Sequence, residues 1–255
     1  SGLVGSEMCI RDSDRMPLGS SEDIRSIDRK TLIEFYQQWY SPQMATVVVV
    51  GDVDPVSIEK KIKEMFASIP RKKVKGYRVY PLTYEKGIAL HEIGDDLKRS
   101  SELELIIPHP CVVGNTVGTI YRKELGSLLV RAITNRLQAR QIRSNVSDAW
   151  FLSDKNHFVF TFSGTDKSGL LQQVSDLSNE LECILKNGFT PEELDDAIKE
   201  LSRTLKVDCS AQLSGKWCDD FVDYVISGDR YIQSEKEMRQ LLEKIRSTDS
   251  ATLQK

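Results

Sequence analysis

Histidine is scarce in this sequence of 255 residues, which contains only His91, His109 and His157. No two of them are close enough along the chain to share one face of a helix at the i, i+4 spacing of helical zinc motifs. Neither H-E-x-x-H nor H-x-x-E-H occurs. The sequence therefore argues against a self-contained zinc hydrolase site.

Other absences narrow the class of protein further. The longest apolar stretch, Ala45 to Val50 with Thr46 inside it, is far shorter than the roughly 20 residues that cross a bilayer, so we expect no transmembrane helix. The 35 basic and 38 acidic residues give a net charge of −3, which argues against a nucleic-acid partner. There is no G-x-S-x-G nucleophile motif, no phosphate-binding loop and no C-x-x-C pair. The cysteines are scattered and indicate free or buried thiols: Cys9, Cys111, Cys183, Cys209 and Cys218.

What is present is typical of a globular protein of one or two domains, with 40% hydrophobic and 29% charged residues. Residues 1–13 (SGLVGSEMCIRDS) lack the apolar region of a secretory signal and resemble translated sequencing-adapter sequence. We therefore exclude them from the predicted fold. Residues 253–255 do not complete a structural element, and we expect the chain to be a fragment of a longer protein.

The N-terminal part is predicted to form a helix, a strand and a second helix. Apolar residues recur at helical spacing up to Tyr40, and Asp28 is the expected N-cap. Residues 44–51 (MATVVVVG) are apolar on both faces, which favours a strand buried inside a sheet. Asp54 and Pro55 begin the second helix, which Pro70 ends. The basic stretch RKKVKGYR from Arg71 then indicates a solvated linker, preferred over an anion-binding patch, and a domain boundary near residues 70–85.

Strands and longer helices alternate after this linker. Residues 190–193 (TPEE) carry the clearest local signal: Thr190 can cap a helix, Pro191 suits its first turn, and Glu193 can complete a capping box. The segment Asn187-Gly188 is an acceptable end for the preceding helix. We predict strands at 88–93, 101–107, 146–152 and 158–162, and helices at 115–141, 167–186, 191–209, 216–226 and 235–245.

Few residues invite a catalytic interpretation. Asp52 and Asp54 follow a predicted strand as a pair of carboxylates, but we favour structural roles in the turn and the helix cap. His91 is interpreted as a structural or surface residue of a strand, His109 as a loop residue at a strand end, and His157 as a turn residue. The acidic run from Glu192 to Asp196 is interpreted as a solvated helical turn, and Trp39, Tyr40 and Trp217 as core residues.

Four segments match one protein family in the same order and at compatible distances. They are residues 16–24 (MPLGSSEDI), 35–44 (FYQQWYSPQM), 47–55 (VVVVGDVDP) and 188–194 (GFTPEEL). Together they resemble the pitrilysin/insulinase family of zinc metallopeptidases, which carry the inverted motif H-x-x-E-H. The likeness covers nearly everything from about residue 15 to 250. The residues of the second and third segments are most similar to those of the bacterial periplasmic zinc proteases.

The resemblance implies an α+β fold built as a tandem of related units, each an antiparallel-rich sheet covered by helices on one side. On this pattern residues 14–70 are the C-terminal part of a first, catalytic unit and residues 71–85 are a linker. Residues 86–255 then form a second, non-catalytic unit. In the family the zinc ligands and the general base precede the segment matched by residues 16–24. We therefore expect zinc in the parent protein, and no catalytic, cofactor-binding or metal-binding residue in this chain.

The resemblance also implies the mechanism and partners of the parent protein. Zinc would activate water while a glutamate acts as general base, and the peptide would lie as an added strand in a chamber between two halves. The second unit would line that chamber and confine the substrate. The expected partners are a peptide substrate and the missing half or a homologous subunit, and the expected compartment is the periplasm.

Two other functions are weighed against this one. The chain could belong to a non-catalytic family member that acts as a structural or substrate-presenting subunit. It could also be an unrelated small-molecule α/β enzyme centred on Asp52 and Asp54, which is the weaker alternative. We expect the chain itself to lack peptidase activity. We also expect an exposed apolar edge at Ala45–Val50 that aggregates or seeks a partner.

Overall fold

The computed structural model describes residues 21–71, 87–92, 100–114, 116–152, 155–164, 166–210, 214–228 and 234–254. The adapter-like residues 1–13 and nearly all of the predicted linker 71–85 lie outside them. The chain divides into two compact units. Unit 1 comprises Ser1–Tyr84 with Leu213–Ser227, and unit 2 comprises Glu85–Gln212 with Gly228–Lys255. None of the helices described is long and apolar enough to cross a membrane.

Unit 1 is helical in its described part. It contains the short 3-10 helix η2 (Pro42–Met44) and the helices α1 (Ser21–Ser26), α2 (Arg29–Trp39), α3 (Pro55–Phe66) and α7 (Ser214–Ser227). Both predicted N-caps are confirmed. The Thr31 N–H donates to Asp28 Oδ1 over 2.7 Å. The Ser57 N–H donates to Asp54 Oδ2 over 3.0 Å, so Asp54 has the structural role expected of it.

Two predicted strands are absent from the described residues. Residues 45–50 form no ladder, and Val47 and Val49 are 48% and 46% exposed. Described residues 88–92 likewise form no strand, with Ile88 99% exposed. Both predictions were wrong because an apolar, β-branched sequence becomes a strand only when a neighbouring strand supplies its hydrogen bonds. No described segment supplies that neighbour.

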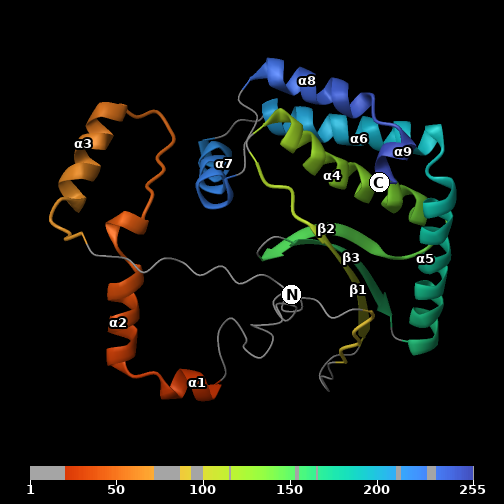
Figure 1. The fold of residues 1–255 in the computed structure, drawn as a ribbon, viewed down its shortest axis with the longest axis horizontal. Coiled ribbons are helices and arrows are strands. Elements are labelled where there is room, and N and C mark those ends of the chain that lie inside the picture. Colours follow the sequence, from red (N-terminus) through yellow and green to blue (C-terminus); the bar gives the residue numbers. More distant parts are fainter. Residues whose placement is uncertain are drawn as a thin grey trace. The chain divides into compact units, whose positions relative to one another are not determined.

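Unit 2 contains a three-stranded antiparallel sheet in the order β1-β3-β2 (Figure 1). The strands are β1 (Ser101–Pro110), β2 (Asn145–Leu152) and β3 (Lys155–Gly164). Their register places Leu105 and Val146 on either side of Phe160. The predicted strands 101–107, 146–152 and 158–162 are thus confirmed, and all three extend further than the sequence indicated.

Helices cover one side of this sheet. They are α4 (Val117–Ala139), α5 (Lys167–Asn187), α6 (Pro191–Ser210), α8 (Glu235–Arg246) and the short α9 (Ser250–Leu253). Helix α4 contacts β2, α5 contacts β3, and α6 and α8 pack on α4 (Figure 1). The predicted α+β class, with helices over an antiparallel sheet, is confirmed.

The hydrophobic core lies between the sheet and these helices. Phe160 and Phe162 of β3 are 2% and 0% exposed, and they belong to the same cluster as buried leucines of α4, α5, α6 and α8. Burial of each such side chain contributes about 1.5–3 kcal/mol. By contrast, helices α1, α2 and α3 of unit 1 contain no buried residue.

The junction between α5 and α6 follows its sequence closely. The Thr190 N–H donates to Glu193 Oε2 over 2.8 Å, and the Glu193 N–H donates to Thr190 Oγ1 over 3.3 Å, which confirms the capping box. Gly188 ends α5 with a φ of 70°. A Cβ atom at Gly188 would clash with Ser250 Oγ, so α9 can approach this junction only because the residue is glycine.

Candidate functional site

A groove of about 650 Å³ lies within unit 2, between α4, β2 and α6. Most of its lining is polar, and it comes from segments far apart in the sequence. The lining residues are Ser127, Val130, Arg131, Thr134, Asn135 and Gln138 of α4, Val146, Ser147 and Asp148 of β2, and Glu200 of α6.

Helix α4 supplies one continuous stripe of this lining. Its contributing residues, from Ser127 to Gln138, recur at intervals of three and four, which places them on a single helical face. The opposite face of α4 carries buried Leu128, Ala132 and Leu137. Packing of that apolar face against the core therefore turns the polar stripe toward the groove.

The groove reaches the outer edge of the sheet. β2 pairs with β3 on one side, and no described strand pairs with its other side. Successive strand residues point to opposite faces of a sheet. Three consecutive residues of this edge strand, Val146, Ser147 and Asp148, line the groove, so the groove reaches the edge of β2. An open strand edge offers backbone N–H and C=O groups to an incoming extended chain.

The charged groups of the groove differ in their partners. Asn135 Nδ2 donates to Glu200 Oε2 over 3.5 Å, and Arg131 Nη2 donates to the neutral hydroxyl of Thr204 over 3.1 Å. The carboxylate of Asp148 accepts from His109 Nε2 over 2.9 Å and from Asn156 Nδ2 over 3.2 Å. Both carboxylates are thus held by donors, whereas the guanidinium of Arg131 contacts no acid among the described residues.

Asp148 is fixed by three elements. His109 reaches it from β1 across Phe158 of β3, on whose ring the imidazole stacks with centroids 4.4 Å apart. On the other side the carboxylate lies against Gly126 of α4, where a Cβ atom would be 2.6 Å from Asp148 Oδ2. The side chain of Asp148 is therefore held in one position where it lines the groove.

Two histidine predictions are corrected by this arrangement. His109 lies inside β1 instead of a loop, because Pro108 and Pro110 are tolerated on an edge strand. His157 was predicted as a turn residue, but it lies within β3 and is 1% exposed. Burial, and then the nearby His109, lowers the pKa of His157, so its neutral form is favoured. His91 is exposed, as expected, but lies in no strand.

The groove does not fit a zinc ion. A helical zinc motif places histidines at i and i+4, whereas the residues that α4 turns toward the groove at this spacing include Ser127 and Arg131 and no histidine. Neither serine nor arginine is a usual zinc ligand. Across the described part of the chain, no three His, Cys, Asp or Glu residues are grouped closely enough to hold a metal. The pair Asp52 and Asp54 offers no alternative, because Asp54 caps α3 by accepting from both the N–H and the hydroxyl of Ser57.

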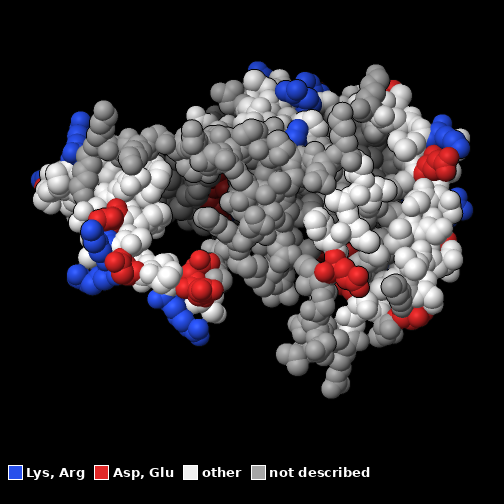
Figure 2. Space-filling view, turned by 60° about the horizontal axis from the view of Figure 1, so that its bottom comes forward, with Lys and Arg blue, Asp and Glu red and all other residues white. Residues whose placement is uncertain are grey.

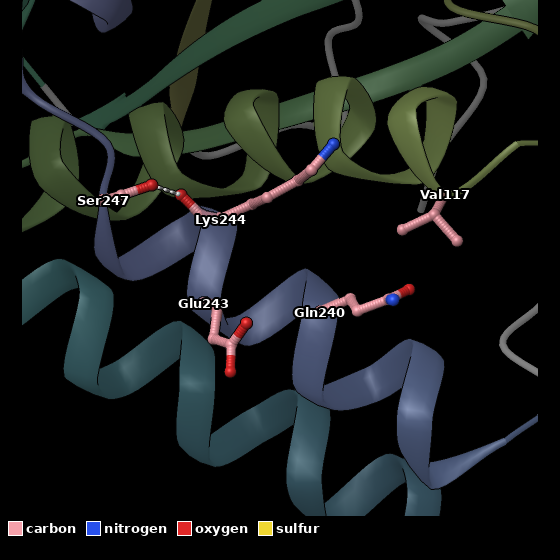
Figure 3. A pocket seen from close by; sticks show the side chains of 5 residues that line it. All are labelled: Val117, Gln240, Glu243, Lys244 and Ser247. Carbon is pink, nitrogen blue, oxygen red and sulfur yellow. Dashed lines mark hydrogen bonds between the residues drawn. The ribbon is translucent and has the colours of Figure 1, made fainter.

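A second, smaller hollow lies between α8 and the start of α4 and has a volume of about 450 Å³. Figure 3 shows Lys244 reaching from α8 toward α4 while Glu243 points away from it. The Lys244 ammonium lies over the ring of Tyr121 at 5.8 Å, so the hollow is closed on that side by a cation–π contact. Its few lining side chains do not converge on one point, and the groove beside β2 remains the stronger candidate.

The sequence interpretation missed one buried charged group, Arg136 of α4. Its side chain is 7% exposed and forms a bidentate ion pair with Glu193, and its Nη2 also donates to the Gly188 carbonyl. Arg136 lowers the pKa of Glu193, and Glu193 in turn raises the pKa of Arg136. The sequence indicated the burial of Arg136 only through its position in the predicted helix. It lies between the core residues Ile133 and Leu137, one turn before Arg140.

The described surface carries both signs of charge. On the face drawn in Figure 2, basic and acidic groups are interspersed over the described residues. This mixture agrees with the small net charge of the sequence. It supports no basic stripe of the kind that binds nucleic acid on that face.

Comparison with known proteins adds a family match. Residues 26–201 match the model of the "Peptidase M16 inactive domain". The chain is 26% identical over 245 residues to the "Probable zinc protease PqqL" of Escherichia coli strain K12. That alignment covers 93% of this chain and 24% of the relative. The chain thus spans about a quarter of the length of that curated relative.

The fold is also similar to solved structures of the same relative. The crystal structure of the periplasmic protease PqqL from Escherichia coli matches with a TM-score of 0.83 and 22% identity, over 99% of this chain and 29% of that one. The structure of the first half of the same protease matches with a TM-score of 0.82 and 24% identity, over 99% and 56% respectively. These likenesses extend over both units.

Proposed function

Since this chain belongs to the peptidase M16 family through its inactive domain, we propose that it is part of a zinc metalloendopeptidase. In this proposal unit 2 lines the substrate chamber and holds the peptide without cleaving it. The observation that carries the proposal is the groove at the edge of β2, where the stripe that α4 presents contains no histidine, cysteine or carboxylate. The groove offers a binding surface but no metal-based chemistry.

The mode of binding follows from the groove's shape. A peptide lying along β2 would form main-chain hydrogen bonds with the open strand edge. Its alternate side chains would then point toward the polar stripe of α4. Because Asp148 is held by His109, Asn156 and the close approach to Gly126, this wall would not have to reorganise when the peptide binds.

We also propose that residues 14–70 are the C-terminal part of the first, catalytic unit and that residues 71–85 link it to the second unit. Leu32, Phe35 and Tyr36 of α2 are each more than half exposed, which is unusual for the apolar stripe of a globular helix. The rest of the catalytic unit would cover them. Zinc, its ligands and the general base would lie in that part of the parent protein, which we place in the periplasm.

The test is a titration of a fluorescent, extended peptide into the 255-residue chain, followed by anisotropy. We expect saturable binding, no cleavage of the peptide and no stoichiometric zinc by metal analysis. Ser127→Tyr places a bulky side chain in the groove and should weaken binding at least about tenfold, the equivalent of 1.4 kcal/mol. Ser175→Tyr changes an exposed serine of α5 outside the groove and is the matched control.

Several outcomes would contradict the proposal. If no extended peptide binds, or if both tyrosine variants bind like the unaltered chain, the groove is not the peptide site. If one tightly bound zinc per chain is found, the assignment of the metal site to another part of the parent is wrong. If the upstream reading frame contains family sequence without H-x-x-E-H, the chain belongs to a non-catalytic subunit. Thermal unfolding of both variants checks that each one remains folded.

A further inference from the structure

Helix α1 and the start of α2 in unit 1 share a sequence with the C-terminal helices of unit 2. Residues 22–32, here called the first copy, align without a gap with residues 243–253, the second copy. Each copy contains the end of one helix, a short turn and an aspartate that caps the next helix. Two apolar positions are identical: Ile24 corresponds to Ile245, and Leu32 corresponds to Leu253.

The second copy shows what these apolar positions contact. Ile245 is fully buried, and Leu253 packs against the same core cluster. Helix α8, which carries Ile245, contacts both α4 and α6. At the turn, the Tyr121 hydroxyl of α4 lies 3.0 Å from Thr248 Oγ1. The packed pair α4 and α6 is therefore the surface on which the second copy docks.

The first copy has no such surface among the described residues. Ile24 and Leu32 are each more than half exposed, and α1 and α2 contain no buried residue. The exposed apolar side chains continue beyond the first copy along α2 as Phe35 and Tyr36. An apolar stripe of this extent normally lies against another element.

Resting on the proposed function, we propose that the first copy docks on a pair of packed helices built like α4 and α6, which the rest of the catalytic unit supplies. Ile24 and Leu32 then occupy apolar depressions equivalent to those of Ile245 and Leu253. In the solved first half of the Escherichia coli relative, almost half of the chain lies outside the match, which is long enough for such a layer.

Two differences between the copies define the chemistry of this partner. Thr248, which meets the Tyr121 hydroxyl, is replaced in the first copy by Ile27. The partner of Ile27 therefore presents an apolar side chain where α4 presents a hydroxyl, since a buried hydroxyl without a partner is costly. Ser250, which accepts from the Phe189 N–H, is replaced by Arg29. The helix junction that faces Arg29 therefore lies farther away.

The first experiment grafts the first copy onto unit 2 of the 255-residue chain. The graft carries Lys244→Asp, Thr248→Ile and Ala251→Lys, with Tyr121→Phe to remove the hydroxyl. Its thermal unfolding midpoint should stay within about 5 °C of that of the unaltered chain. The same graft with Tyr121 retained should unfold at a lower temperature, because the hydroxyl loses its partner. The matched control adds Ile245→Ala to the graft and should unfold roughly 5–15 °C below it.

The second experiment compares hydroxyl-radical labelling of the 255-residue chain and of the complete parent protein. Labelling of Ile24 and Leu32 should fall severalfold in the parent, whereas Ile245 should be protected in both proteins. Equal labelling of Ile24 and Leu32 in the two proteins would overturn the inference. So would a graft that unfolds as early as its Ile245→Ala control, or one that needs no Tyr121→Phe. A parent without H-x-x-E-H contradicts the proposed function instead, and neither the graft nor the labelling depends on that motif.

Discussion

The same short sequence occurs once in each unit, with very different surroundings. Residues 22–32 (EDIRSIDRKTL) and 243–253 (EKIRSTDSATL) are identical at seven of eleven positions. Their local hydrogen bonds agree: Ser26 Oγ donates to the Asp23 carbonyl over 2.8 Å, and Ser247 Oγ donates to the Lys244 carbonyl over 2.9 Å. Their burial does not agree, because Ile24 is 58% exposed whereas Ile245 is fully buried.

The N-cap hydrogen bonds within these two segments also agree. The Thr31 N–H donates to Asp28 over 2.7 Å, and the Thr252 N–H donates to Asp249 over 2.8 Å. Turn and cap geometry thus follows from the sequence alone, whereas burial requires partner elements. Unit 2 contains those partners in α4, α5 and α6, and the described part of unit 1 does not. Four pairs of substitutions, one member in each unit, should reproduce this difference.

The largest difference between the units should come from a buried arginine and an exposed one. Arg136→Met removes the buried guanidinium and leaves the partly buried carboxylates of Glu193 and Glu180 without it, so it should cost about 3–5 kcal/mol of unfolding free energy in unit 2. Arg25→Met in exposed α1 should cause no measurable change. Urea denaturation followed by circular dichroism measures both. Equal effects would mean that the Arg136 network does not hold unit 2 together.

The two isoleucines of the repeated sequence provide the next test. Ile245→Ala creates a cavity in a packed core and should cost about 2–5 kcal/mol. Ile24→Ala, at the corresponding position of unit 1, should leave stability unchanged in this chain. The same denaturation experiment measures the pair. A large loss of unfolding free energy from Ile24→Ala would show that Ile24 is buried in a core of unit 1, which would contradict its exposure.

The two aspartate caps should behave more alike. Asp249→Ala removes the cap of α9 and should cost about 1 kcal/mol. Asp28→Ala should lower the protection of the α2 amides against hydrogen exchange without changing the unfolding of unit 2. An effect of Asp28→Ala on unit 2 would contradict the independence of the two caps.

The smallest effect is a dependence on pH. Arg136 holds the pKa of Glu193 below its ordinary value, so this ion pair stabilises unit 2 at pH values above the ordinary glutamate pKa of about 4.3. That stability is lost as the pH falls through the lowered pKa. Glu193→Gln should therefore flatten the acid limb of a plot of unfolding midpoint against pH. Glu59→Gln should not, because its partner Lys63 is exposed. An unchanged acid limb in Glu193→Gln would argue against the ion pair as its source.

Local signals predicted the longer helices but missed the short α1 and α9, and contacts between distant segments determined the strands and the burial. The capping box at Thr190 and Glu193 could be predicted because both partners lie within one helical turn. The strand predicted at residues 44–51 was wrong because its pairing partner is not encoded nearby. His157 was misplaced because its burial depends on the extent of β3 and its pairing with Pro108 of β1 and Ala149 of β2.

The groove could not be predicted, because it joins residues 127–148 to Glu200 through packing of α4 on α6. The repeated sequence was detectable in principle. Its two copies are 221 residues apart, far beyond the periods typical of repeat proteins. The absence of H-x-x-E-H could be read from the sequence, and the structure added that the α4 residues lining the groove include no usual metal ligand.

The most direct test of the account is amide hydrogen exchange of the 255-residue chain, with and without a saturating extended peptide. We predict that the amides of β2 become more protected when the peptide is present, because its strand pairs with their open edge. The amides of α2 should exchange faster than those of β2, and equally fast with and without the peptide, because α2 contains no buried residue. Unchanged protection of β2 at full peptide occupancy would contradict the assignment of unit 2 as a peptide-holding wall.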